Sequence, residues 1–123
     1  MANVEVRSFD SPDETRPFQG KGQIEVMKVG GREIAKATFE PGWRWSENVK
    51  PIAETDSCQF AHFGYVLSGR MRIVMDDGGE AEAGPGDVVS IPPGHDAEVL
   101  GDEACVMVDV GEGAPDAEYA KSS

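Results

Sequence analysis

Cysteine and histidine are scarce in this chain, with two residues of each among 123. Cys58 and Cys105 each lie in an apolar run, and no dense cysteine pattern surrounds them, which excludes a disulfide-rich scaffold. We therefore expect two thiols. Any site that depends on imidazole has only His62 and His95 to draw on.

Positive charge and long apolar runs are also lacking. The chain has 11 basic against 23 acidic residues, a net charge of −12, which disfavours binding to nucleic acid or to an anionic membrane. No run approaches the roughly 18–20 apolar residues that span a bilayer, and the N-terminal residues do not resemble a signal peptide. Phosphate-binding glycine loops are absent, so we expect no nucleotide cofactor. These absences predict a cytoplasmic protein without nucleic-acid or membrane partners.

Helical periodicity is missing as well, and 15 glycines with 8 prolines would interrupt any long helix. Short runs instead alternate apolar and polar side chains, which is the pattern of half-buried strands. Six such runs cover residues 23–29, 32–39, 59–67, 71–75, 87–91 and 104–110. Turn-forming glycine, proline and aspartate residues separate them. The pattern predicts an all-β protein.

The clearest turn is Asp76-Asp77-Gly78-Gly79, which predicts an antiparallel hairpin between residues 71–75 and 80–83. Meanders of this kind hide their edges when they close into a jelly-roll barrel. Residues 43–57 lack clean alternation, and we expect them to cross the barrel end as a loop.

One barrel accounts for the domain organisation. We expect it over residues 21–110, because the runs of alternating side chains fall within that range. The first twenty residues are polar and are expected to form an N-terminal arm, and residues 111–123 a polar C-terminal tail.

Two segments carry recognisable motifs. A Gly-Asp turn, a short apolar strand and a Pro-Pro-Gly turn occupy residues 86–95, and the earlier segments are Cys58-Gln59-Phe60-Ala61-His62 and Tyr65-Val66-Leu67-Ser68-Gly69. Together they resemble the two sequence motifs of the cupin family. The resemblance implies a cupin-type double-stranded β-helix, or jelly-roll barrel. It leaves the activity open, since cupins include metal enzymes, sugar isomerases, sensors and storage proteins.

In many cupins the first motif supplies two histidines and a glutamate, followed seven residues later by a glycine. Counting back from that glycine, the resemblance places Asp56, Cys58 and His62 where the family has His, His and Glu. The histidine of the second motif falls at Ala97, and the nearby imidazole is His95.

Alternation indicates that these donors share the barrel interior. Residues two apart on a strand lie on one face, which groups Cys58 with His62 and His95 with Ala97. A thiolate and two imidazoles form an open three-ligand set for zinc, iron, nickel or manganese, and suit neither magnesium nor calcium. Each residue also has a structural interpretation: Cys58 as a small core hydrophobe, His62 as a hydrogen-bonded core histidine, and His95 as a hydrogen-bonding partner of its loop.

The second unusual feature is Trp43-Arg44-Trp45. Alternation places both indoles on one face and Arg44 on the other, so Trp43 is expected to line a ligand pocket and Arg44 to hold a carboxylate. The alternative is a core plug or an oligomer interface. Tyr65 and Asp109 lie on strands that can also face the lumen, and strand parity does not decide between the two sides. We include Tyr65 among the expected ligand-binding residues.

These observations lead to three functional hypotheses. The first is a small cytoplasmic cupin that holds a divalent transition metal through Cys58, His62 and His95 and acts on a small organic molecule as a dioxygenase, isomerase or lyase. The second is a non-catalytic module of the same fold that binds or senses a small molecule. The third is a metal-free enzyme in which His62 is the catalytic general base. The resemblance further implies a homodimer.

Overall fold

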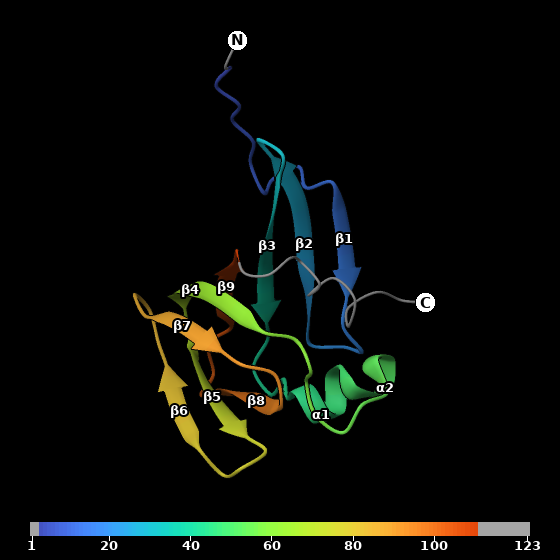
Figure 1. Ribbon diagram of the computed structural model, residues 1–123, viewed down its shortest axis with the longest axis vertical. Coiled ribbons are helices and arrows are strands. Elements are labelled where there is room, and N and C mark those ends of the chain that lie inside the picture. Colours follow the sequence, from blue (N-terminus) through green and yellow to red (C-terminus); the bar gives the residue numbers. More distant parts are fainter. Residues whose placement is uncertain (1–2, 111–123) are drawn as a thin grey trace.

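The computed structural model describes residues 3–110 and consists mainly of strands (Figure 1). Within this range the elements are β1 (Glu14–Pro17), β2 (Gly22–Val29), β3 (Arg32–Phe39), α1 (Trp45–Asn48), α2 (Lys50–Ala53), β4 (His62–Ser68), β5 (Arg70–Met75), β6 (Glu80–Ala83), β7 (Val88–Ile91), β8 (His95–Leu100) and β9 (Cys105–Asp109). Neither of these helices is long and apolar enough to cross a membrane.

The strands form two antiparallel sheets. The larger has the order β1-β2-β3-β9-β4-β7 and the smaller has the order β6-β5-β8. The β2–β3 hairpin pairs from Gly22 opposite Phe39 to Val29 opposite Arg32, and with β1 it extends away from the rest of the barrel (Figure 1). This all-β arrangement confirms the fold class predicted from the alternating runs.

The predicted strands and turns agree with most of the structure. Residues 32–39 are β3, and the predicted hairpin is β5 paired with β6 across Asp76-Asp77-Gly78-Gly79. β8 is not among the predicted runs, although it pairs with β5 over its whole length. Buried and partly buried residues alternate along β8, but the buried ones are His95, Ala97 and Val99. With so few large apolar side chains, the sequence of β8 does not stand out as an apolar run.

The first twenty residues, expected to be an arm, include part of the larger sheet. β1 pairs with β2, with Glu14 opposite Val26. The buried Phe18 stacks on Phe39, with ring centroids 5.4 Å apart. The sheet therefore begins before residue 21, with β1, and Phe18 just after this strand belongs to the core. The tail expected over residues 111–123 lies outside the described residues.

The segment 43–57, expected to be a loop, contains α1 and α2, each only four residues long. Pro51 stands in the first turn of α2, where its missing N–H costs no intrahelical hydrogen bond. The buried Asn48 side chain accepts a hydrogen bond from the N–H of Arg44 at 3.0 Å and donates one to the carbonyl of Gln19 at 2.7 Å. Helices this short leave no helical periodicity in the sequence.

The core lies between the two sheets and is formed by inward-facing side chains of both. Its largest fully buried members include Ile24, Val49 and Val66. Trp43 packs against Phe39 at 4.5 Å and against Phe18 at 5.5 Å between ring centroids. Both cysteines are buried thiols, as expected.

β4 is buried on one side only. Its inward residues are His62, Gly64 and Val66. Its outward residues, about half exposed, are Phe63, Tyr65 and Leu67. The exposed side of β4 is therefore more apolar than the side that faces the core.

A glycine lets β4 and β9 approach each other closely. Gly64 pairs with Asp109, and a Cβ added at Gly64 would lie 2.5 Å from the carbonyl oxygen of Val108 and 3.3 Å from the Cα of Asp109. The first contact is far inside van der Waals distance and involves backbone, which cannot move away without shifting the strand. Gly64 therefore sets the spacing between β4 and β9.

We expect Gly64→Ala to lower the free energy of unfolding by about 1–3 kcal/mol, because the added methyl group forces these strands apart. Urea denaturation measures the loss. Gly79→Ala is the matched control, since the nearest atom to its Cβ would be a side-chain oxygen of Asp77 at 3.4 Å, which is ordinary van der Waals contact. Equal stability of both variants would contradict the close approach assigned to Gly64.

Candidate metal centre

His62 opens β4 and lies beside the last residue of β9. Its Nδ1 is 2.8 Å from Oδ2 of Asp109, and both side chains are buried. Because a carboxylate only accepts hydrogen bonds, Nδ1 of His62 carries the proton and donates it. In the neutral ring, Nε2 then has a lone pair, and it faces the barrel interior.

His95 is the first residue of β8 and follows the Pro92-Pro93-Gly94 turn. Its Nδ1 donates a hydrogen bond to the carbonyl of Pro92 at 2.9 Å, so the structural interpretation of His95 as a partner of its loop is correct for this nitrogen. A backbone bridge connects the same residue to Cys58, whose N–H donates to the carbonyl of His95 at 2.7 Å. The bridge places the Cys58 side chain beside the imidazole of His95.

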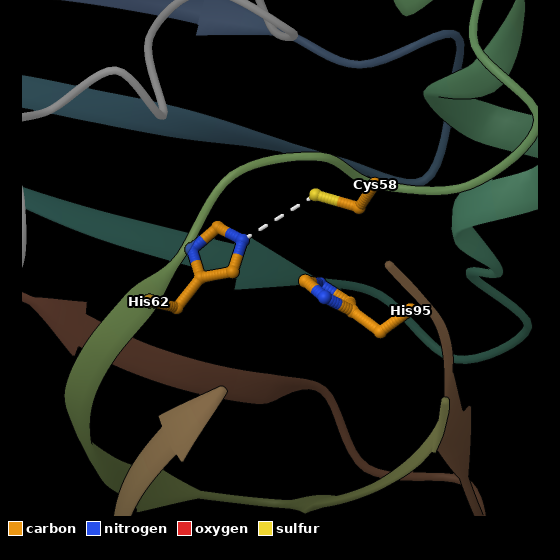
Figure 2. A group of neighbouring side chains, drawn as sticks. All are labelled: Cys58, His62 and His95. Atoms are coloured by element: carbon orange, nitrogen blue, oxygen red, sulfur yellow. Dashed lines mark hydrogen bonds between the residues drawn. The ribbon is translucent and has the colours of Figure 1, made fainter. Parts of the chain in front are cut away.

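Cys58, His62 and His95 come together in the interior, as Figure 2 shows, and their donor atoms all lie within 4.8 Å of one another. Sγ of Cys58 is 3.5 Å from Nε2 of His62. Two ligands of one tetrahedral zinc ion, bonded at about 2.3 Å through sulfur and about 2.0 Å through nitrogen, stand roughly 3.5 Å apart. The thiol and this imidazole already have the separation of two ligands of one ion.

The residues around this cluster fit a metal ion in a second respect. Histidines that bind metals usually donate their other ring N–H to a carboxylate or a backbone carbonyl, which fixes the tautomer and the ring orientation. Asp109 does this for His62, and the carbonyl of Pro92 does it for His95. Each imidazole is thus left with Nε2 as the nitrogen able to bind a metal.

Burial shifts the pKa values of two further side chains, His95 and Cys105. Burial, with a smaller effect of His62, lowers the pKa of His95 to about 4, so its imidazole is neutral at pH 7. Burial raises the pKa of the Cys105 thiol to about 11. Cys105 therefore remains a neutral thiol in the core, as the sequence suggests for this position.

The two histidines open onto a cavity of about 40 Å³. Its lining residues are Ile24, Ala35, Ala37, Phe39, Trp43, Trp45, His62, Met71, Ile91, His95, Ala97, Met107 and Asp109. Most of them are apolar, and no lysine or arginine is among them. Among these lining residues, His62, His95 and Asp109 carry the titratable side chains.

The structure separates the other residues expected at the site. Trp43 lines the cavity, but the neighbouring Arg44 points outward, where it forms an ion pair with Glu98 at 2.7 Å. Tyr65 lies on the outer face of β4 and is 46% exposed. Asp56 is fully exposed, 4.0 Å from Lys50. Arg44 and Tyr65 do not line this cavity, because both alternate with residues that face inward.

Sequence reasoning did not assign Asp109 or Trp45 to the site. Strand parity alone leaves open whether Asp109 faces the lumen, and nothing near it in the sequence connects it to His62, which is 47 residues away. Alternation correctly grouped Trp45 with Trp43 on the side opposite Arg44. The signal that could have found Asp109 is an acidic residue at the end of an otherwise apolar run.

The comparisons with known proteins agree with the barrel fold. A family model described as "Cupin domain" matches residues 37–111. A search of curated proteins finds no match. Several solved structures are similar to this chain in fold.

A variant of oxalate decarboxylase from Bacillus subtilis is 17% identical with a TM-score of 0.62, over 99% of this chain and 33% of that one. A Cupin 2 conserved barrel domain protein from Salinispora arenicola is 20% identical with a TM-score of 0.60, and the match covers 88% of this chain and 87% of that one. The polyketide cyclase RemF from Streptomyces resistomycificus is 19% identical with a TM-score of 0.59, and the match covers 89% of this chain and 81% of that one. At these identities the likeness concerns the fold, and the motifs, the barrel and the family match together show that the chain belongs to the cupin family.

Proposed function

We propose that this cupin binds a divalent transition metal through Cys58, His62 and His95 and presents it to a small organic molecule in the barrel. The observation that carries the proposal is the convergence of three donor atoms within 4.8 Å, with each imidazole held by a partner on its other nitrogen. A structural role alone would not require one donor atom of each of these three residues to lie this close together.

The donor set restricts the metal. A thiolate with two imidazoles favours zinc and other borderline-soft ions over magnesium or calcium. Three protein ligands leave one position of a tetrahedral site open, as in catalytic rather than structural zinc sites. When bound, such an ion supplies a Lewis acid at that open position.

The chain's own residues determine what reaches that position. The cavity of about 40 Å³ has room for roughly three water-sized groups, and its walls are largely apolar. Asp109 accepts the hydrogen bond from the Nδ1–H of His62 and keeps the ring oriented. A small molecule that enters meets the two imidazoles, which are among the lining residues.

Cobalt(II) tests the proposal directly. We expect the reduced protein, purified without a polyhistidine tag, to bind one Co²⁺ with the intense near-ultraviolet absorption of a thiolate–cobalt bond, because Cys58 supplies the sulfur. The Cys58→Ser variant should lack that absorption. Addition of Zn²⁺ should remove it from the wild-type protein.

Cys105→Ser is the matched control, since the second thiol does not belong to the cluster. It should retain the thiolate–cobalt absorption. If the wild-type protein takes up neither Co²⁺ nor Zn²⁺ at neutral pH under reducing conditions, the metal proposal fails.

A second candidate rests on the His62–Asp109 pair. An imidazole oriented by a carboxylate at 2.8 Å is the arrangement of a general base, and Sγ of Cys58 lies 3.5 Å from its Nε2. Cys58 is only 1% exposed and does not line the cavity, which disfavours direct attack on a ligand there. Metal-free protein that retains full activity on a ligand would support this candidate, and a ligand bound without turnover would support a sensing module.

A further inference from the structure

Of the three residues in the proposed ligand set, Cys58 alone lies outside a strand. It belongs to residues 54–61, the segment between α2 and β4, and Figure 2 shows it on the ribbon that leads to His62. Its carbonyl accepts hydrogen bonds from the N–H groups of Gly94 at 2.6 Å and His95 at 3.2 Å. This contact with β8 is an isolated bridge, so the position of the thiol also depends on what holds the rest of the segment.

The residue before Cys58 is held by a side chain of the β5–β6 hairpin. Ser57 is 5% exposed, and its hydroxyl donates a hydrogen bond to Oδ2 of Asp76 at 2.7 Å. The same hydroxyl accepts a hydrogen bond from the side-chain amide of Gln59 at 3.0 Å. Hydrogen bonds to a carboxylate are stronger than those between neutral groups. Asp76 therefore holds the ligand-bearing segment at the position next to the cysteine.

Asp76 also contacts the residue before His95. Its backbone N–H donates to the carbonyl of Gly94 at 2.8 Å. Gly94 has a φ of 92°, and a Cβ added there would lie 3.1 Å from Oδ2 of Asp76. Glycine at this position thus leaves room for the carboxylate. Through its side chain and its backbone, one residue holds the immediate predecessors of two proposed ligands.

We propose that Asp76 is a positioning residue of the metal site, whose carboxylate acts through Ser57 to keep the Cys58 thiol beside His95. The inference rests on the proposed function, because the position of the thiol affects metal affinity only if the thiol binds the ion. A ligand that is held in place before the ion arrives loses less freedom on binding. Partners beyond the ligands contribute about 10–100-fold to metal affinity, and we expect an effect at the lower end of that range.

Zn²⁺ affinity, measured by competition with a chelator under reducing conditions, gives the first test. Asp76→Ala removes the acceptor and should weaken Zn²⁺ binding about tenfold. Asp76→Asn keeps an oxygen that can accept the hydrogen bond from Ser57, so it should restore most of the affinity. Asp77→Ala is the matched control and should bind Zn²⁺ like the wild type. It removes the same charge from the next residue, whose carboxylate accepts a hydrogen bond from the N–H of Gly79 within the turn.

The reactivity of the Cys58 thiol gives a second test, which requires no metal. Cys58 is 1% exposed, so a thiol reagent reaches it only when the segment opens. In metal-free, reduced protein, Asp76→Ala and Ser57→Ala should each speed its modification about tenfold, the effect of one lost hydrogen bond. The double variant should react no faster than either single variant, because both remove the same bond.

Peptide mass spectrometry distinguishes the two thiols in this experiment. Cys105 is buried in β9, away from the segment, and its modification should keep the wild-type rate. Equal acceleration at Cys58 and Cys105 would indicate a general loss of stability and would contradict the positioning role. Unchanged reactivity of Cys58 in Asp76→Ala would contradict it as well.

The two measurements separate this inference from the metal proposal. If the wild type binds Zn²⁺ and Asp76→Ala binds it equally well, the positioning role is wrong and the metal site stands. Equal losses of affinity in Asp76→Ala and Asp77→Ala would assign the effect to charge and would also overturn the role. If the wild type takes up no Zn²⁺, the metal proposal fails, and the reactivity of Cys58 alone decides whether Asp76 holds the thiol in place.

Discussion

Cys58→Ala, His62→Ala and His95→Ala should each bind Zn²⁺ at least about 100-fold more weakly than the wild-type protein. In the proposed site the three donors hold one ion, so the loss of any of them removes a bond and disturbs the geometry of the other two. Competition with a coloured chelator at neutral pH under reducing conditions measures the affinities. Retained affinity in any of these variants would remove that residue from the ligand set.

Asp109→Asn provides a graded comparison within the same site. An asparagine in its place keeps the size of the side chain but accepts a weaker hydrogen bond from the Nδ1–H of His62. Because outer partners of this kind contribute about 10–100-fold to metal affinity, we expect a loss within that range. Arg44→Ala is the control, because Arg44 lies on the outside against Glu98. An equal loss in both variants would indicate a general loss of stability.

The second large expected effect is a loss of folding stability in acid, caused by protonation of His95. In the metal-free protein, a change from pH 7 to pH 4 should lower the free energy of unfolding by up to about 3 kcal/mol through His95 alone. Its pKa is about 4 in the folded protein and about 6.5 in the unfolded chain. Between these values the unfolded chain binds a proton that the folded protein does not, so unfolding is favoured as pH falls. Above pH 6.5 the contribution is fully present.

Urea denaturation from pH 7 to pH 4 measures this dependence, with His95→Gln as the comparison. Glutamine has no proton to gain, so its stability should vary less steeply with pH over this window. Below about pH 4.5 the ion-paired Glu98 adds its own dependence in both proteins, since hydrogen bonding from Arg72 is the main cause that lowers its pKa. Parallel curves for the two proteins would show that His95 is not held neutral by burial.

Much of the barrel could be predicted because its strands are half-buried and its turns use glycine, proline and aspartate. The runs at residues 23–29 and 32–39 and the hairpin into residues 80–83 agree with β2, β3 and β6 within a residue. β8 and β1 were missed because both have few large apolar side chains, and their pairing depends on neighbours far away in the sequence.

Some residues of the candidate site could likewise be predicted from the sequence, and others could not. The resemblance and alternation identified Cys58, His62 and His95, which the structure brings together. Between Cys58 and His62 the chain is not a regular strand, so their meeting depends on the bridge from Cys58 to His95. Asp109 could not be assigned, because its role follows from the pairing of β4 with β9, which no local pattern specifies.

The two faces of β4 have a consequence for how the chain selects its fold. A slip of one residue would bury Phe63, Tyr65 and Leu67, and by hydrophobicity alone that inverted register would be favoured. Steric constraints oppose it. Gly64 allows the close approach of β9, and Gly69, with a φ of 76°, has no room for a Cβ beside the backbone of Ala104. His62 thus faces inward because glycine fixes the alignment of its strand, and the barrel accepts a more apolar exterior there in order to keep an imidazole inside.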